Sequence, residues 1–175
     1  AYTFSKKLQL AATVAYTDYK RSTRTTRHDF EKNTDELTTG EGEQDISKFN
    51  SFVFRTTVQY QLSNKVSLQP GIDINREAAN GPRIANNPVI TDYAAFVSAE
   101  VKLGSKLNIR PGLRFVKNSV YNAPPVIPSI NTKFIISKKF DLRFAYAYGF
   151  RSPALRELYF YFVDANHNVV GNPNL

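Results

Sequence analysis

Apolar and polar residues alternate along seven segments of this chain, and this pattern constrains its fold more than any other feature. In the first segment, residues 8–16, leucine, alanine, valine and tyrosine occupy every second position. The pattern recurs over residues 52–60, 66–74, 93–103, 107–115, 132–136 and 142–148. Because successive side chains of a β-strand point to opposite faces, a period of two predicts strands with one apolar and one polar face.

The charged residues of these segments lie on the predicted polar faces. Although 22% of the residues are charged, none falls on the predicted apolar faces. The opposite faces include Asp73, Glu100, Arg55, Arg110, Arg114 and Arg143. A soluble sandwich would turn the polar face to water, whereas a transmembrane barrel turns it to the lumen and gives the apolar face to lipid. Alternation alone is compatible with both.

The connections between the segments distinguish the two architectures. Tight turns are expected near residues 5–6, 63–64, 104–105 and 137–138, and long connections over 22–47, 76–90, 122–130 and 152–175. Short turns that alternate with long loops are typical of outer-membrane barrels. We therefore predict an all-β fold, an antiparallel up-and-down transmembrane β-barrel.

The number of predicted strands implies that the barrel is incomplete. No apolar run approaches the roughly 18 residues that a membrane-spanning helix needs. Single-chain bacterial barrels have even strand numbers from about 8 upward, and about seven strands leave two open edges. We expect residues 1–175 to be a partial barrel domain. The chain starts at Ala1 without a leader, so we expect an excised or processed piece of a longer protein.

A short repeat supports the predicted turns. The copies are FSKKLQL (4–10), LSNKVSL (62–68), LGSKLNI (103–109) and ISKKFDL (136–142). Each is expected to form a hairpin turn, with a lysine that either reaches the membrane interface or is an ordinary polar turn residue. Pro70 and Pro111 follow at the same offset in two copies, and because proline removes a ladder donor we expect a bulge there.

Two motifs near the end of the chain carry a family resemblance. YAYGFRSPALRELY (146–159) and GNPNL (171–175) resemble TonB-dependent outer-membrane receptors, in which a Y-G-x-G-F-R-A-P strand end leads into an extracellular loop and N-P-N-L opens the next strand. Ser152 stands where the family usually has alanine. The runs RPGLR (110–114) and PSIN (128–131) are similar to the middle of the family's barrel. We also expect Pro153 to end the preceding strand.

The resemblance implies a function. It implies a 22-stranded barrel in the bacterial outer membrane, closed by a plug domain, that imports a scarce metal chelate: haem, an iron siderophore or cobalamin. The implied partners are membrane lipid, the plug, the TonB energy-coupling complex, the chelate and a surface lipoprotein, with no intrinsic cofactor. Two alternatives stay open, a passive porin-like or adhesin-like barrel and a soluble β-sheet binding module with a basic face. No nucleophile–base pair or acid pair predicts an enzyme.

The resemblance also places candidate ligand residues. His167 lies between the two motifs, where haem receptors of the family carry a loop histidine that binds haem iron, and imidazole is a suitable axial ligand. Siderophore and cobalamin receptors share both motifs, so the cargo stays open. The other expected ligand-binding residues are Arg151, Tyr159, Tyr161, Asp164 and Asn166. Aromatic residues 159–162 are expected to pack on the plug or to line the ligand site.

Three charged groups remain. We predict that Arg55, Arg110, Arg114 and Arg143 face the lumen, where they could pair with the plug or an anionic substrate. Although the net charge is +8, Arg21, Arg24, Arg27 and His28 have no aromatic stacking platform, so we expect a rim that touches lipid headgroups and no nucleic-acid partner. Residues Asp35, Glu36, Glu41, Glu43 and Asp45 are expected to form a solvated loop, because their spacing does not match a calcium loop.

Overall fold

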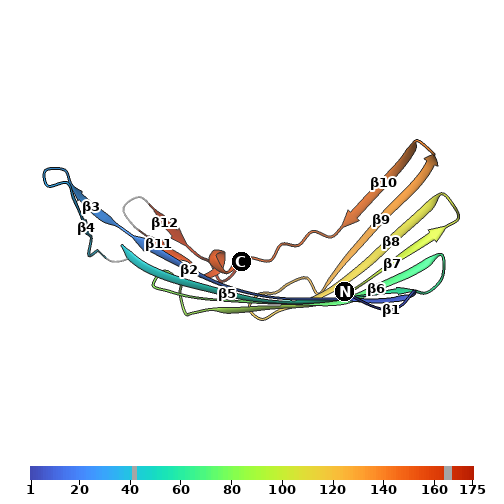
Figure 1. Cartoon of the computed structure of the whole chain (residues 1–175), viewed down its shortest axis with the longest axis horizontal. Helices are drawn as coiled ribbons and strands as arrows, with labels where there is room; N and C mark the ends of the chain where they lie inside the picture. The colour runs from blue at the N-terminus through green and yellow to red at the C-terminus, as the bar shows by residue number, and fades with distance from the viewer. Residues whose placement is uncertain (41–42, 164–166) are drawn as a thin grey trace. The chain divides into compact units, whose positions relative to one another are not determined.

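A computed structural model describes residues 1–40, 43–163 and 167–175, and these are mostly β-structure (Figure 1). One eight-stranded sheet has the order β1 (Tyr2–Ser5), β2 (Leu8–Arg24), β5 (Gln44–Gln61), β6 (Val66–Asn80), β7 (Val89–Leu103), β8 (Leu107–Asn118), β9 (Val126–Ser137) and β10 (Phe140–Ala147). The smaller elements are the hairpins β3 (Thr26–Asp29)–β4 (Thr34–Leu37) and β11 (Tyr161–Val163)–β12 (Asn168–Val170), and the helix α1 (Leu155–Tyr159).

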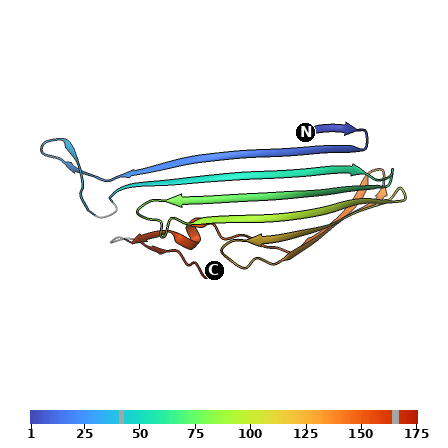
Figure 2. The same ribbon diagram turned by 90° about the horizontal axis from the view of Figure 1, so that it is seen from below.

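The sheet is an up-and-down meander, as predicted. Each strand lies beside the next sheet strand of the chain, and the pairs β1–β2, β7–β8, β8–β9 and β9–β10 are antiparallel. The sheet has one strand more than the seven predicted segments, because the short β1 folds back on β2 (Figure 2). No helix among the described residues is long and apolar enough to cross a membrane.

The described chain forms two compact units. The turn unit comprises Ala1–Ala15, Val53–Asn75 and Thr91–Ser152, and the loop unit comprises Tyr16–Phe52, Arg76–Ile90 and Pro153–Leu175. Strands β2, β5, β6 and β7 contribute residues to both units. The turn unit holds β8, β9 and β10, and the loop unit holds β3, β4, β11, β12 and α1.

The register of the turn unit confirms the two predicted faces. Directly opposed residues of antiparallel strands lie on the same side of the sheet. Val97 faces Leu113, and Leu113 faces Pro128 on β9. On the other side, Lys133 lies between Asn108 and Arg143. The apolar face is exposed, which suits contact with lipid and would be costly in water.

The repeat forms hairpin turns, as predicted. In three copies the serine hydroxyl accepts a hydrogen bond from the lysine N–H two residues later: Ser5 from Lys7 (3.2 Å), Ser63 from Lys65 (3.2 Å) and Ser137 from Lys139 (3.3 Å). The third copy has Gly104 in place of this serine, with a φ of 66° that favours glycine. The repeated lysines therefore occupy equivalent backbone positions in the turns.

Several strands are longer than predicted. A barrel strand crosses the hydrocarbon core with about 9–11 residues, whereas β2 has 17 and β5 has 18. The connection expected over residues 22–47 is therefore shorter, from residue 25 to residue 43, and it contains the β3–β4 hairpin. Apolar alternation marks only the part of a strand that faces lipid, and backbone pairing continues beyond it with polar outward residues.

The expected bulge at Pro111 and the expected end of a strand at Pro153 are both wrong. The β8–β9 register continues unbroken through Pro111, which faces Ile130, and the β7–β8 register is the same on both sides of it, so no residue bulges. Strand β10 ends at Ala147 and not at Pro153. The last backbone bond to β9 is from Tyr148 to Pro128 (3.0 Å). Gly149 follows, and it has no side chain to pack on the sheet.

Candidate functional site

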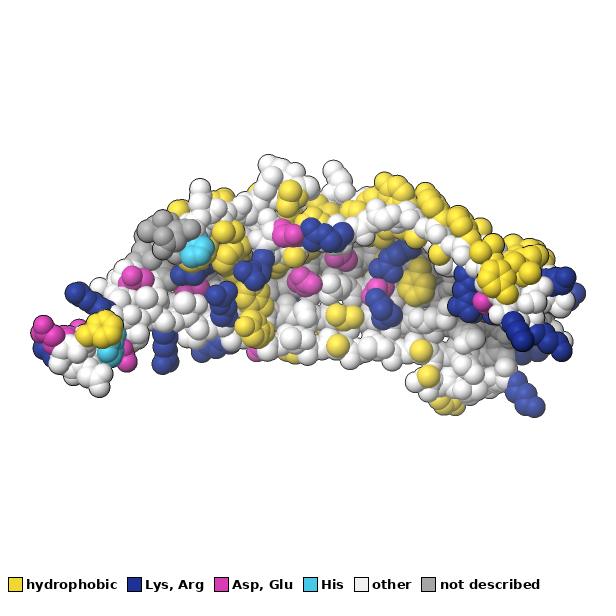
Figure 3. Space-filling model, turned by 90° about the horizontal axis from the view of Figure 1, so that it is seen from above, with side chains coloured by type: hydrophobic (Ala, Val, Ile, Leu, Met, Phe, Trp, Pro, Cys, Tyr) yellow, Lys and Arg dark blue, Asp and Glu magenta, His cyan; other side chains and the backbone are white. Residues whose placement is uncertain are grey.

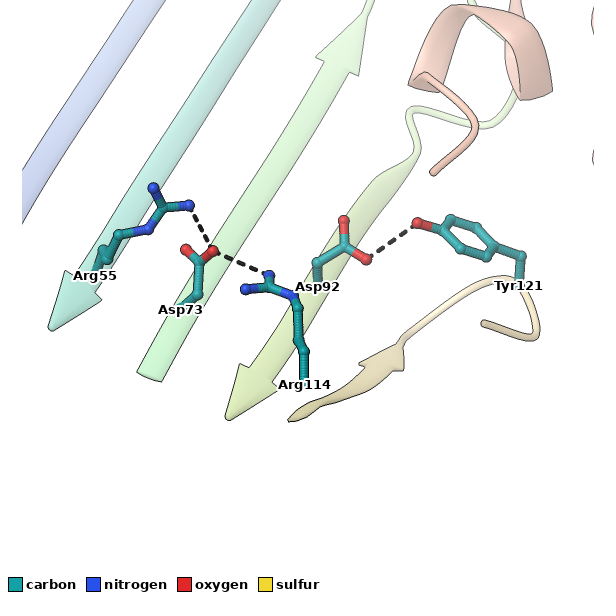
Figure 4. Close-up of polar contacts among 5 residues, drawn as sticks. All are labelled: Arg55, Asp73, Asp92, Arg114 and Tyr121. Carbon is teal, nitrogen blue, oxygen red and sulfur yellow. Dashed lines mark hydrogen bonds and ion pairs between the residues drawn. The ribbon is translucent and has the colours of Figure 1, made fainter. Parts of the chain in front are cut away.

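A cluster of charges on the polar face of the turn unit centres on Asp73 (Figure 4). Its Oδ2 accepts hydrogen bonds from Nη2 of Arg55 at 2.6 Å and from Nη2 of Arg114 at 3.0 Å, and the two arginines approach it from opposite sides. The Asp73 side chain is 8% exposed, whereas that of Arg55 is 57% exposed. Two guanidinium groups share one carboxylate, so the cluster keeps a net positive charge toward the solvent side.

Glycine makes this arrangement possible. A side chain at Gly71 would collide with the ring of Phe96 and with the carbonyl of Thr56, so only glycine lets Phe96 lie against β6. The guanidinium of Arg114 lies 5.9 Å from the centre of the Phe96 ring. Arg114 thereby reaches from β8 to Asp73 on β6. Arg55, Phe96 and Arg114 border an open depression of about 480 Å³.

The other arginines of the polar face also have acidic partners. Arg110 pairs with Glu100 at 2.7 Å, and Glu100 also accepts a hydrogen bond from Asn108 at 2.7 Å. Asp141 pairs with Lys133 at 2.8 Å and with Arg143 at 3.4 Å. Acidic and basic side chains lie next to one another on the face shown in Figure 3. All four predicted arginines therefore belong to ion pairs on the polar face.

A buried tyrosine fastens the connection between β8 and β9. The hydroxyl of Tyr121 donates to Oδ1 of Asp92 at 3.0 Å, and the amide of Asn118 donates to the same oxygen at 2.6 Å (Figure 4). Tyr121 is 8% exposed, and its ring lies 6.3 Å from that of Phe150. We did not predict this contact from the sequence, because nothing in the local pattern indicates which residue of a polar connection turns inward.

In the loop unit, the segment after Pro153 folds into the short helix α1. Its apolar residues Leu155 and Leu158 are buried, and Leu158 is 1% exposed. The Glu157 side chain caps the helix by accepting a hydrogen bond from the Ala154 N–H at 2.7 Å. We did not predict this helix, because five residues are too few to show a helical period.

Backbone contacts pack this segment against the β6–β7 connection. Ile84 forms a bridge with Phe160, and the Tyr161 N–H donates to the Arg83 carbonyl at 2.9 Å. Gly171 donates to the carbonyl of Phe160 at 2.7 Å. A Cβ on Gly171 would meet the backbone of α1 at 2.7 Å, so this close approach needs glycine. Phe160 is consequently buried within its own chain, instead of being left for the plug or a ligand as we expected.

Arg83 contacts both a buried carboxylate, that of Asp45, and the aromatic ring of Phe162. Its Nε lies 3.7 Å from Oδ2 of Asp45, and its guanidinium lies 4.2 Å from the centre of the Phe162 ring. Asp45 is 4% exposed, so the expectation that it belongs to a solvated acidic loop is wrong. The same Oδ2 of Asp45 accepts a hydrogen bond from the Ser47 hydroxyl at 3.1 Å, and this bond and the Arg83 ion pair offset part of the cost of burying the carboxylate.

His167 lies at the surface end of this cluster. Its ring stacks on Phe162, with the ring centres 5.0 Å apart and the planes 27° apart, and its side chain is exposed. The three groups Arg83, Phe162 and His167, which we call the loop stack, therefore combine a cation, an aromatic face and an imidazole.

The comparison with protein families decides between the architectures. A family model described as "TonB dependent receptor-like, beta-barrel" matches residues 1–175. The chain belongs to this family. No curated protein matched the chain. Members of the TonB-dependent receptor family are transporters and receptors of the bacterial outer membrane, which act with a plug and with TonB. The apolar face of the sheet therefore meets lipid.

The structure of this receptor barrel leaves the predicted ligand residues in different surroundings. Tyr159 is half-buried on α1, and Tyr161 is exposed on β11. Arg151 is exposed and belongs to the turn unit. Asp164 and Asn166, like Glu41 of the acidic loop, lie outside the described residues. His167 is the predicted ligand residue that belongs to the loop stack. Neither Arg83 nor its ion-pair partner Asp45 was predicted as a site residue.

The second histidine of the receptor barrel has a different environment. His28 on β3 pairs through Nδ1 with Asp35 on β4 at 2.9 Å and contacts Phe30 edge-on at 4.7 Å. Phe30, at the hairpin tip, is 88% exposed. Within the described residues, no three His, Cys, Asp or Glu side chains lie close enough together to hold a metal ion.

Proposed function

We propose that this TonB-dependent receptor barrel imports a chelated metal, and that haem is its cargo. The observation that supports haem most directly is the loop stack, in which His167 is exposed beside the Phe162 ring. Imidazole is a suitable axial ligand for haem iron. The Phe162 ring lies between the Arg83 guanidinium and the imidazole, so stacking holds His167 in place at the surface.

The charge of the loop stack fits the same cargo. Haem carries carboxylates, and guanidinium groups recognise carboxylates through paired hydrogen bonds. Arg83 lies over Phe162 and only 3.7 Å from Asp45, so its position is supported from the buried side. Iron siderophores and cobalamin are the competing cargoes, and they do not need an imidazole ligand.

The polar face supplies a surface for the next step of import. Arg55 and Arg114 share Asp73, and this cluster retains a positive charge beside an open depression. We propose that this surface, with Arg110 and Arg143, faces the lumen and pairs with acidic groups of the plug or with an anionic cargo as it passes. We also propose that residues 151–174 capture the cargo, with His167, Arg151, Tyr159, Tyr161, Asp164 and Asn166 as the candidate ligand residues.

Replacing His167 with alanine in the full-length receptor should weaken haem binding at least about tenfold, because an axial ligand bond would be lost. Cobalamin and ferric siderophore binding, measured separately by titration, should not change. His28→Ala is the matched control, since it removes the other histidine and should leave haem binding intact. Unchanged haem affinity in the His167 variant would remove the haem assignment and leave the other two chelates.

A further inference from the structure

Three basic side chains lie on the outward face of the loop unit. They are Lys20 on β2, Lys48 on β5 and Arg76 on β6, and all three are exposed. Along β5, the buried residues Asp45 and Ser47 alternate with the exposed Ile46 and Lys48. Lys48 therefore points away from the side that holds the loop unit's small core.

Two contacts place Lys20 directly across from Lys48. The Thr25 N–H donates to the Glu43 carbonyl at 3.0 Å, and the rings of Tyr19 and Phe49 lie 6.0 Å apart. Counting along the two antiparallel strands from either contact pairs Lys20 with Lys48. Tyr19 and Phe49 lie on the inner face, where they line a small cavity of about 220 Å³ together with Leu155. The two lysines are thus neighbours on the outer face.

Arg76 lies on the next strand, four residues along from the lysine pair. A Cβ on Gly81 would lie 2.9 Å from the Cα of Ser47, which sets the β5–β6 register in this unit. Counting back from that contact places Arg76 across from Phe52. Along β6, Asp73 and Ala79 are buried on one side, and Arg76 is exposed on the other, which is the outer face. We call Lys20, Lys48 and Arg76 the outer basic patch.

The outer basic patch has a net positive charge. None of its three residues forms an ion pair within the described part of the chain, and Asp18 is the acidic residue of β2 on the same face. Like charges placed directly across two strands destabilise the pairing. The Lys20–Lys48 pair therefore gains stability from an anion that binds between the two side chains.

The neighbouring residues show where this anion would lie in the membrane. Tyr16 and Phe52, on the same outward face, are 68% and 38% exposed. Outward aromatic residues form girdles at the two interfaces of an outer-membrane barrel. The strands continue past these aromatics toward the long connections, which are extracellular in such barrels. The lysine pair is thus at the headgroup level of the outer leaflet.

We propose that the outer basic patch binds the phosphate groups of a phosphorylated glycolipid in the outer leaflet. The charge is complementary, and two lysines with an arginine one strand away can contact more than one phosphate. This inference does not depend on the cargo or on the loop stack. Each basic residue near an anionic lipid surface contributes about fivefold to binding.

The test uses the full-length receptor in nanodiscs and measures binding of lipid A, which carries two phosphates, against dephosphorylated lipid A. The variant K20Q/K48Q/R76Q should bind lipid A at least about tenfold more weakly than the wild type. The matched control K7Q/K65Q/K106Q removes the same charge from the turns and should bind normally. The dephosphorylated lipid should bind weakly to every protein.

Equal weakening in the two variants would overturn the proposal, because it would mean that net charge and not the patch sets the affinity. Equal binding of the two lipids to the wild type would overturn it as well. Resistance to unfolding in detergent, followed by the gel shift on heating, verifies that the variants are folded. K20R/K48R, which keeps both charges, should retain most of the binding.

Discussion

Replacing Val97 with arginine should prevent most of the receptor from inserting, whereas replacing its neighbour Ser98 with arginine should be tolerated. Val97 lies near the middle of β7 on the outward face, opposite Leu113. An arginine on the lipid face at the bilayer midplane costs about 2–4 kcal/mol. Ser98 is on the polar face opposite Gly112, which leaves room for a longer side chain.

Folding into lipid vesicles from urea measures both effects. The inserted fraction is followed by the gel shift on heating, and the midpoint of urea unfolding gives the difference in stability. Val97→Leu serves as the control for a change of side-chain size without charge. If Ser98→Arg were the more harmful substitution, the faces of the sheet would be assigned the wrong way round.

Leu158→Ala should destabilise the loop unit's small core by about 2–5 kcal/mol, the usual cost of emptying a buried leucine site. Leu158 is the most deeply buried large side chain among the described residues, at 1% exposed, and Gly171 lies against its backbone. We expect the loss to be local, because Leu158 belongs to the loop unit and β8, β9 and β10 belong to the turn unit. We therefore expect faster hydrogen exchange over residues 155–163 and weaker cargo binding, with unchanged barrel insertion.

Val163→Ala provides the control, since Val163 is 47% exposed on β11 in the same segment. Its exchange rates should remain close to those of the wild type. Exchange in Leu158→Ala that matched the wild type would contradict the claim that α1 anchors the segment.

The strands and their faces were predictable because lipid selects an apolar residue at every second position. This selection ends at the membrane–water interface. Alternation therefore could not show that β2 continues beyond residue 16 or that β5 begins before residue 52. There the outward positions hold residues such as Lys20 and Lys48, which look like loop residues in the sequence. Backbone pairing, which is independent of side-chain polarity, continues to Arg24 and from Gln44.

The candidate site was less predictable because its contacts depend on register and on close backbone approach. Alternation assigned Arg114 to the polar face, but its bond to Asp73, two strands away, depends on Phe96 lying over Gly71. Asp45 looked solvated because four acidic neighbours surround it in sequence, whereas its burial depends on Arg83 from a distant connection. Such partners can be identified only when the register between the strands is known.

The topology is tested most directly by labelling single cysteines on intact cells. This chain contains no cysteine, so each introduced thiol reports on one position. Glu31→Cys lies at the tip of the β3–β4 hairpin, and Ser105→Cys lies in the β7–β8 turn. Since the long connections of a receptor barrel are extracellular and the short turns periplasmic, a membrane-impermeant maleimide should modify position 31 in intact cells and position 105 only after the cells are broken. Modification of position 105 but not 31 in intact cells would contradict the account.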